Sequence, residues 1–164
     1  MIVVSNTSPI VNLATVGRLE LLRQLYGTVL IPQAVYYEIA VVGAGLPGTV
    51  EVDAFDWIET HQVRDRVRVT SLQLEVDEGE AEAIALAAEL GAGLLLLDER
   101  RGRVVASRLG LKSIGLLGVL IEAKHSGFIH GVKPIVDDLI GKAGFWISRE
   151  LYDRILQAEE EIER

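Results

Sequence analysis

Four acidic side chains and one amide in this chain have types and positions that suit a divalent metal site. Asn6 follows a short β-branched run near the start, and Asp98 follows four consecutive leucines. Glu38 lies beyond a second apolar run, and Glu80 and Glu82 open an alanine-rich segment. Mg²⁺ and Mn²⁺ prefer such hard oxygen ligands, and bound ions of this kind can activate water to cut a phosphodiester. The residue types therefore indicate metal-dependent phosphodiester hydrolysis.

Each carboxylate also has an ordinary structural explanation. Glu80 and Glu82 stand near the start of an expected helix, where negative charge is favoured by the helix dipole. Glu38 could be a solvated helix residue, and Asp98 could cap the helix that follows it. In an open parallel sheet, however, ligands bind outside the carboxyl ends of the strands. That rule favours Asn6 and Asp98, because each comes directly after an expected strand.

Basic and hydroxyl side chains beside these residues could bind a substrate. Arg100, Arg101 and Arg103 follow Asp98 at the start of an expected helix, where they could contact phosphate. They could equally be solvated helix residues or partners for surface acids. Thr7, which follows the first strand, joins Arg100 and Arg101 in the expected substrate-binding set.

Other patterns in the sequence carry no function. Residues 43–48, GAGLPG, spell a dinucleotide-binding pattern, but they follow an expected helix, contain a proline and open no apolar helical stripe. The segment is therefore interpreted as a loop. The three histidines, His61, His125 and His130, have no metal-ligand spacing, and no P-loop lysine or cysteine nucleophile is present.

The elements that would position these residues alternate between strands and helices. Strands are expected at 2–5, 28–31, 94–97 and 111–114, with shorter extended pieces at 57–60 and 67–69. Helices are expected after a cap at Thr7 or Ser8, at 18–26, 33–41, 77–90, 99–109 and 116–125, and twice between 132 and 164. This alternation predicts an α/β fold with a parallel sheet and helices on both faces, in one domain over residues 1–164.

Composition and charge narrow the possible functions. The chain is 49% apolar and only 5% aromatic, so aliphatic side chains must build the core, as in a buried parallel sheet. No apolar run could span a bilayer and the N-terminus lacks a basic signal region, which favours a cytoplasmic protein without a membrane anchor. The net charge of −8 argues against a broad basic face for nucleic acid. It does not argue against a nuclease, because a carboxylate site attracts phosphate once it holds cations.

The C-terminal part, from about residue 132, offers an apolar stripe of Ile147, Leu151 and Ile155. The stripe could pack on the core or on a second subunit. Because oligomers of small proteins are most often two-fold symmetric, we expect a homodimer.

Four sequence segments, in this order and at this spacing, resemble the PIN-like domain superfamily. The segments are VVSNTSPI, PQAVYYEIA, GEAEAIALAAELGAGLLLLDER and GRVVASRLGL. The resemblance runs from Ile2 to about Leu156. It is nearest to a branch of short prokaryotic proteins related to toxin nucleases of the VapBC type.

The resemblance implies a three-layer α/β/α sandwich with a parallel sheet of four or five strands, and RNA cleavage that depends on Mg²⁺ or Mn²⁺. It also implies RNA and an antitoxin protein as partners. The catalytic residues would be Glu38, Glu80 and Asp98, and the metal ligands would be Asn6, Glu38, Glu80 and Asp98, with Glu82 added.

The departure from the family pattern is Asn6, where most active members carry aspartate. An amide oxygen can ligate a hard cation but brings no charge. The alternative is therefore a non-catalytic module that binds RNA or protein. If the site is intact, Asn6, Glu38, Glu80 and Asp98 should meet in one cleft.

Overall fold

A parallel five-stranded sheet forms the centre of the computed structural model, which describes residues 1–161 of the 164-residue chain. The strands are β1 (Val3–Ser5), β2 (Val29–Pro32), β3 (Ile58–His61), β4 (Leu94–Leu96) and β5 (Ser113–Ile114). Their order in the sheet is β3-β2-β1-β4-β5, and every pairing is parallel. The expected α/β fold with a parallel sheet is confirmed.

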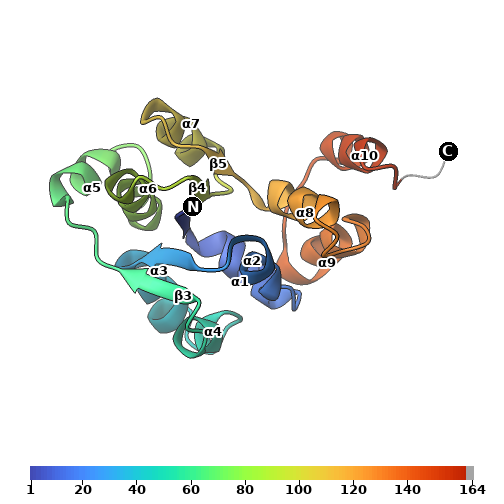
Figure 1. Cartoon of the computed structure of the whole chain (residues 1–164), viewed down its shortest axis with the longest axis horizontal. Coiled ribbons are helices and arrows are strands. Elements are labelled where there is room, and N and C mark those ends of the chain that lie inside the picture. Colours follow the sequence, from blue (N-terminus) through green and yellow to red (C-terminus); the bar gives the residue numbers. More distant parts are fainter. Residues whose placement is uncertain (162–164) are drawn as a thin grey trace.

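Helices cover both faces of the sheet (Figure 1). Alternate strand residues point to opposite faces, so Val3 and Leu96 belong to one apolar cluster while Val4 and Leu95 belong to the other. The first face is covered by α1 (Thr7–Thr15), α2 (Glu20–Tyr26), α8 (Leu116–His125) and α9 (Lys133–Ala143). The second face is covered by α5 (Arg66–Leu72), α6 (Glu78–Leu90) and α7 (Arg100–Arg108). This is the three-layer α/β/α sandwich that the resemblance implied.

Helix α6 packs directly on the sheet and carries two of the candidate acids inward. The Asp77 side chain caps its start by accepting a hydrogen bond from the Glu80 backbone N–H at 2.8 Å. Gly91 ends it in a left-handed conformation, at φ 61°. Every residue from Gly79 to Ala87 is buried, including both glutamates. α6 has 13 residues, and within residues 1–161 no helix is long and apolar enough to cross a membrane.

The segment after β2 is one helical stretch that widens along its length. It begins as α3 (Gln33–Tyr37) and continues as the π-helical turn η1 (Glu38–Val42), in place of the single regular helix expected over 33–41. Turns follow, as expected, and then the short helix α4 (Thr49–Ala54), which was not expected. The sequence gives little signal for α4, because only Val52 of its six residues is buried and no apolar stripe results.

The extended piece expected at Val67–Val69 is wrong, because these residues lie in α5. The alternating basic and β-branched residues imitate a strand. The helix forms because the Asp65 side chain caps it, accepting from the Arg68 N–H at 3.0 Å, and because Val69 and Leu72 bury one helical face. The cap of α1 also differs from the expectation, because Asn6 and not Thr7 or Ser8 holds the capping position.

The C-terminal region forms α9 and α10 (Arg149–Ala158), as expected. The three residues of the expected apolar stripe lie in different environments. Ile155 packs against the core beside the fully buried Leu156, whereas Leu151 is 38% exposed and Ile147 lies in the linker before α10. Only Ile155 of the three residues therefore packs within the chain, and the homodimer stays a prediction.

Candidate functional site

The candidate residues gather where the connections of the sheet change direction. From β1 the chain runs to β2 and β3 on one side, whereas β4 and β5 lie on the other side. Adjacent strands whose connections diverge leave a crevice at their carboxyl ends, which is the usual ligand position in such sheets. Asn6 lies at the end of β1, with its N–H donating to the Leu96 carbonyl at 3.0 Å, and Asp98 lies just beyond β4. The sheet therefore places these two residues at the crevice, as predicted.

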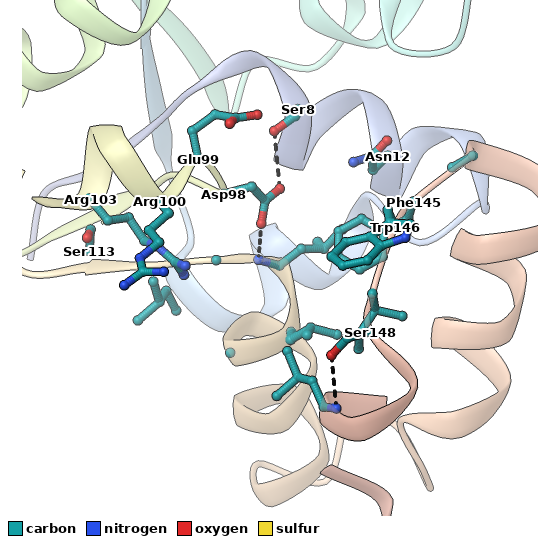
Figure 2. A pocket seen from close by; sticks show the side chains of 18 of the residues that line it. Ser8, Asn12, Asp98, Glu99, Arg100, Arg103, Ser113, Phe145, Trp146 and Ser148 are labelled. Carbon is teal, nitrogen blue, oxygen red and sulfur yellow. Dashed lines mark hydrogen bonds between the residues drawn. The ribbon is translucent and has the colours of Figure 1, made fainter. Parts of the chain in front are cut away.

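Two consecutive hydroxyls at the start of α1 hold a carboxylate on each side. The Thr7 hydroxyl donates to Glu38 Oε2, and the Ser8 hydroxyl donates to Asp98 Oδ2 at 3.1 Å, as Figure 2 shows for the latter pair. Glu38 and Asp98 are sixty residues apart in sequence, yet both are fixed against the same helix N-terminus. The dipole of α1 favours negative charge there.

Asp98 joins the starts of two helices. Besides accepting from Ser8, its Oδ1 accepts from the Leu116 backbone N–H, the first of α8, at 2.6 Å (Figure 2). The helix that directly follows it, α7, has Glu99 at its capping position. Asp98 therefore does not cap the next helix, as the ordinary explanation held, but bridges α1 and α8 across the crevice.

Asn6 is a buried amide without a protein partner. It is only 6% exposed, and among residues 1–161 its side chain makes no hydrogen bond. Its amide atoms are not among the fully enclosed side-chain atoms that lack a hydrogen-bond partner, so a ligand or ordered water can reach them. Gly79 leaves the adjoining space, because a Cβ added there would lie 3.6 Å from Asn6 Oδ1 and 3.3 Å from Glu38 Oε2. The same point lies 3.7 Å from Asp77 Oδ1, so three oxygens face one small hollow.

Glu38 starts the π-helical turn that follows α3. Its carbonyl accepts from the Gly43 N–H at 3.0 Å, five residues on. Such π turns are rare and occur frequently at functional sites. Glu38 also lines a pocket of about 590 Å³ together with Asp77 and Gly79.

Glu80 is the most perturbed acid of the site. It is 8% exposed, and a Cβ added at Gly102 in α7 would lie 3.2 Å from its Oε2. Burial, together with the nearby charges of Asp77, Glu99 and Glu38, raises the pKa of Glu80 from 4.5 to about 7. Glu80 can therefore exchange a proton near neutral pH.

The raised pKa of Glu80 predicts that the protein loses stability as the pH rises. The folded chain holds this proton more tightly than the unfolded chain, so the benefit is complete below about pH 4.5 and is lost as the pH rises through about 7. The total fall in the free energy of unfolding should be up to about 3 kcal/mol. Glu80→Gln should flatten this slope, which urea unfolding between pH 4.5 and 8 would measure. The exposed Glu78→Gln is the matched control and should retain the slope.

Glu82 is buried but already has protein partners for both oxygens. Its Oε1 accepts from the Ala34 N–H in α3 at 3.0 Å, and its Oε2 pairs with Arg66 in α5 at 3.0 Å. These contacts hold the start of α3, which leads to Glu38. The geometry gives Glu82 a role in positioning that segment, and its expected role as a metal ligand stays a prediction.

The arginines after Asp98 fall into two groups, those that line a pocket and one that is bound to a protein carbonyl. Arg100 and Arg103 line a pocket of about 860 Å³ with Asp98, whereas the Arg101 Nε donates to the Glu75 carbonyl at 2.7 Å. Gly115 lets the two sides of this pocket approach, because an added Cβ would lie 2.9 Å from Asp98 Oδ1 and 3.0 Å from Arg103 Nη1. Arg103 therefore lies close to Asp98. Arg101, which belonged to the expected substrate-binding set, is held on Glu75 instead.

The expectation of one common cleft is met only in part. Asp98 lines the larger pocket and Glu38 the smaller, and the start of α1 lies between them. Among the described residues, no three aspartate, glutamate or histidine side chains are close enough together to hold a metal ion as they stand. The hollow at Gly79 offers an amide and two carboxylates, a donor set that suits Mg²⁺ or Mn²⁺ when water completes the shell.

Two residues of the site were missed in the sequence. Asp77 was expected only as the first residue of the helix over 77–90, although aspartate just before an apolar helix is a common cap. Trp146, which lines the larger pocket, carries no sequence signal because it lies in a linker between helices.

Comparison with known proteins agrees with this architecture. A family model described as a PIN domain, DUF3368, matches residues 2–161. Among solved structures, the chain is similar to a PilT N-terminus domain protein, SSO1118, from the hyperthermophilic archaeon Sulfolobus solfataricus P2. The two are 20% identical, with a TM-score of 0.53 over 75% of this chain and 93% of that chain, a likeness that shows the fold alone. No curated protein sequence matches this one. Because the family model spans almost the whole described chain, the chain belongs to the PIN domain family, as its resemblance indicated.

Proposed function

We propose that the chain is an endoribonuclease that hydrolyses RNA phosphodiesters with Mg²⁺ or Mn²⁺. PIN domains are typically nucleases, and the candidate residues lie at the crevice where an α/β sheet binds its ligands. The observation that carries the proposal is the hollow at Gly79, where the unpartnered Asn6 amide faces Glu38 and Asp77 oxygens. An amide oxygen beside two carboxylate oxygens is a donor set that suits a hard cation whose shell is completed by water.

The residues divide the work by position. Asn6 and Glu38, with Asp77, would hold one cation, and Asp98 would hold or orient a second on the other side of the α1 start. A bound cation supplies an activated water and stabilises the charge on phosphate oxygens. Thr7 and Ser8 keep Glu38 and Asp98 in place through their hydroxyls.

Glu80 and the arginines complete the proposed machinery. Burial and the neighbouring carboxylates raise the pKa of Glu80 to about 7 in the metal-free chain, which makes Glu80 the candidate for a general acid or base. Arg100 and Arg103 line the Asp98 pocket and can contact the phosphates of the substrate. They offset locally the net charge of −8.

The test is cleavage of a mixed RNA pool by the purified chain in Mn²⁺, in Mg²⁺ and in EDTA. The proposal requires internal cuts that appear with metal and disappear with EDTA. The alternative, a non-catalytic module that binds RNA or protein, is favoured by the lack of a carboxylate at Asn6. Binding of RNA without cleavage under every metal condition would support the module and reject the nuclease.

The hollow at Gly79 can be filled without a change of charge. Gly79→Ala should weaken Mn²⁺ binding by about 10-fold, because the new methyl group would stand between Glu38 and Asn6. The unfolding free energy should stay within about 1 kcal/mol, since alanine favours a helix. Gly141→Ala in α9 is the matched control, because its Cβ would meet nothing within 4 Å. Calorimetric titration with Mn²⁺ measures the difference, and equal affinity in both variants would reject the hollow as the metal site.

A toxin role is a further part of the proposal. A ribonuclease of this kind would act on RNA in the cytoplasm, and its host would need an antitoxin protein to survive it. Induced expression of the chain should then arrest growth. The arrest should be lost in a variant that binds no metal.

A further inference from the structure

Trp146 is exposed on the rim of the pocket that contains Asp98. It is 82% exposed and lies in the linker between α9 and α10. The chain has only one other tryptophan, Trp57, which stacks on Phe55 at a centroid distance of 5.6 Å. A large aromatic ring left in water beside a cleft loses the energy of its burial, and such rings are enriched where a partner covers them.

The residues on either side hold the backbone of Trp146 in a defined position. The Phe145 N–H donates to the Leu139 carbonyl at 3.0 Å, and Phe145 packs against the core. On the other side, the Ser148 hydroxyl caps α10 by accepting from the Leu151 N–H at 3.1 Å. Trp146 therefore stands between two anchored neighbours and does not depend on a free loop for its place.

The opposite side of the same pocket is basic. Arg100 and Arg103 lie on one side of Asp98, and Phe145 and Trp146 lie on the other (Figure 2). The pocket has a volume of about 860 Å³, which is enough for one or two nucleotides. A single strand presents phosphates along one edge and free base faces along the other. An aromatic ring opposite two cations is the arrangement that binds such a strand. A duplex hides its base faces and cannot use the ring.

Building on the proposed nuclease function, we infer that Trp146 stacks a base of single-stranded RNA. The stacked base places the neighbouring phosphate between Arg100 and Arg103, next to Asp98. Trp146 is thus a substrate-positioning residue that selects single strands. Since every base has a flat face, it selects for an unpaired base and not for a sequence.

The test is binding of a fluorescently labelled single-stranded RNA octamer in Ca²⁺, which supplies a dication to the carboxylates in place of the Mg²⁺ or Mn²⁺ of the proposed reaction. Trp146→Ala should raise the Kd by about 5- to 100-fold, and Trp146→Phe should restore most of the affinity. In a Trp57→Phe background, RNA should quench the remaining tryptophan fluorescence, which reports Trp146 alone. An octamer duplex should compete poorly. Arg103→Gln should reduce the dependence of binding on salt, whereas Arg101→Gln, whose side chain is anchored on Glu75, should leave it nearly unchanged.

The result separates this inference from the nuclease proposal. If Trp146→Ala binds the octamer as tightly as the parent chain, the stacking role is overturned, whatever the chain cleaves. If Trp146→Ala weakens binding but no variant cleaves RNA with metal, the stacking role stands and the nuclease proposal fails. Because Trp146 is exposed, its replacement should leave the unfolding midpoint unchanged, and a shifted midpoint in both variants would overturn the stacking role as the cause of weaker binding.

Discussion

Asp98→Asn is expected to lower metal-dependent RNA cleavage by about 100-fold or more. An amide cannot supply the negative charge that a dication requires, and the loss of one catalytic carboxylate commonly costs two to four orders of magnitude. The change should leave the local structure in place. The asparagine oxygen can still accept from the Leu116 N–H, and the amide can donate to the Ser8 hydroxyl. Initial cleavage rates on a fluorescent RNA at saturating Mn²⁺ measure the effect.

The matched control removes one negative charge far from the site. Glu150→Gln in α10 breaks only an exposed ion pair with Arg154 and should retain full activity. Glu38→Gln should behave like Asp98→Asn, because it removes the corresponding carboxylate charge on the other side of the α1 start. If Asp98→Asn cleaves RNA at the rate of Glu150→Gln, Asp98 takes no part in the reaction.

Neutralising Asp98 should not stabilise the metal-free chain, although repulsion among site carboxylates suggests it at first. The nearest partners of Asp98 are the starts of α1 and α8, whose dipoles favour its charge. Its replacement should therefore lower the unfolding free energy, by about 1 kcal/mol. Relief of repulsion is expected at Glu80 instead, because Asp77, Glu99 and Glu38 all raise its pKa.

The sequence was sufficient for the fold because the strongest patterns belong to buried elements. Four leucines between a glycine and an aspartate favour a short buried strand, and the capped alanine-rich helix before them ends at a glycine. The failures lie at the edges. Helices α4 and α5 are short and half exposed, so their few apolar positions fit a turn or a strand as well as a helix.

The candidate site was predictable by position but not by pairing. The rule for strand ends selected Asn6 and Asp98 correctly as neighbours of the crevice. The sequence could not show that Glu82 is bound to Arg66, or that Arg101 is anchored on a carbonyl. Such pairings depend on which helices meet, and the pattern of one helix carries no record of the helix it packs against.

Asn6→Asp is expected to tighten Mn²⁺ binding by about 10-fold or more and to raise cleavage with it. The new carboxylate has nearly the shape of the amide and occupies a position without a protein hydrogen bond, so no existing contact is lost. It adds a negative charge beside Glu38 and Asp77, where a dication would be held. Calorimetric titration gives the affinity, and the cleavage assay gives the activity.

The metal-free chain should respond in the opposite direction. A third carboxylate at the hollow repels its two neighbours, so Asn6→Asp should lower the unfolding free energy in EDTA by about 1 to 2 kcal/mol. Mn²⁺ should return more than this loss, because only the folded chain assembles the site. An Asn6→Asp chain that is less stable in EDTA, and equally so in Mn²⁺, would show that no ion occupies the hollow.

The double variant tests whether the two sides of the α1 start act together. If Asn6 and Asp98 serve one metal-dependent reaction, Asn6→Asp should restore only part of the activity that Asp98→Asn removes, since coupled ligands are not additive. Full restoration would mean that one side suffices and that Asp98 contributes charge alone. No cleavage in the parent chain or in any of the three variants would instead reject the nuclease. The buried amide would then be a feature of a binding module, in which the crevice between β1 and β4 holds a ligand without cutting it.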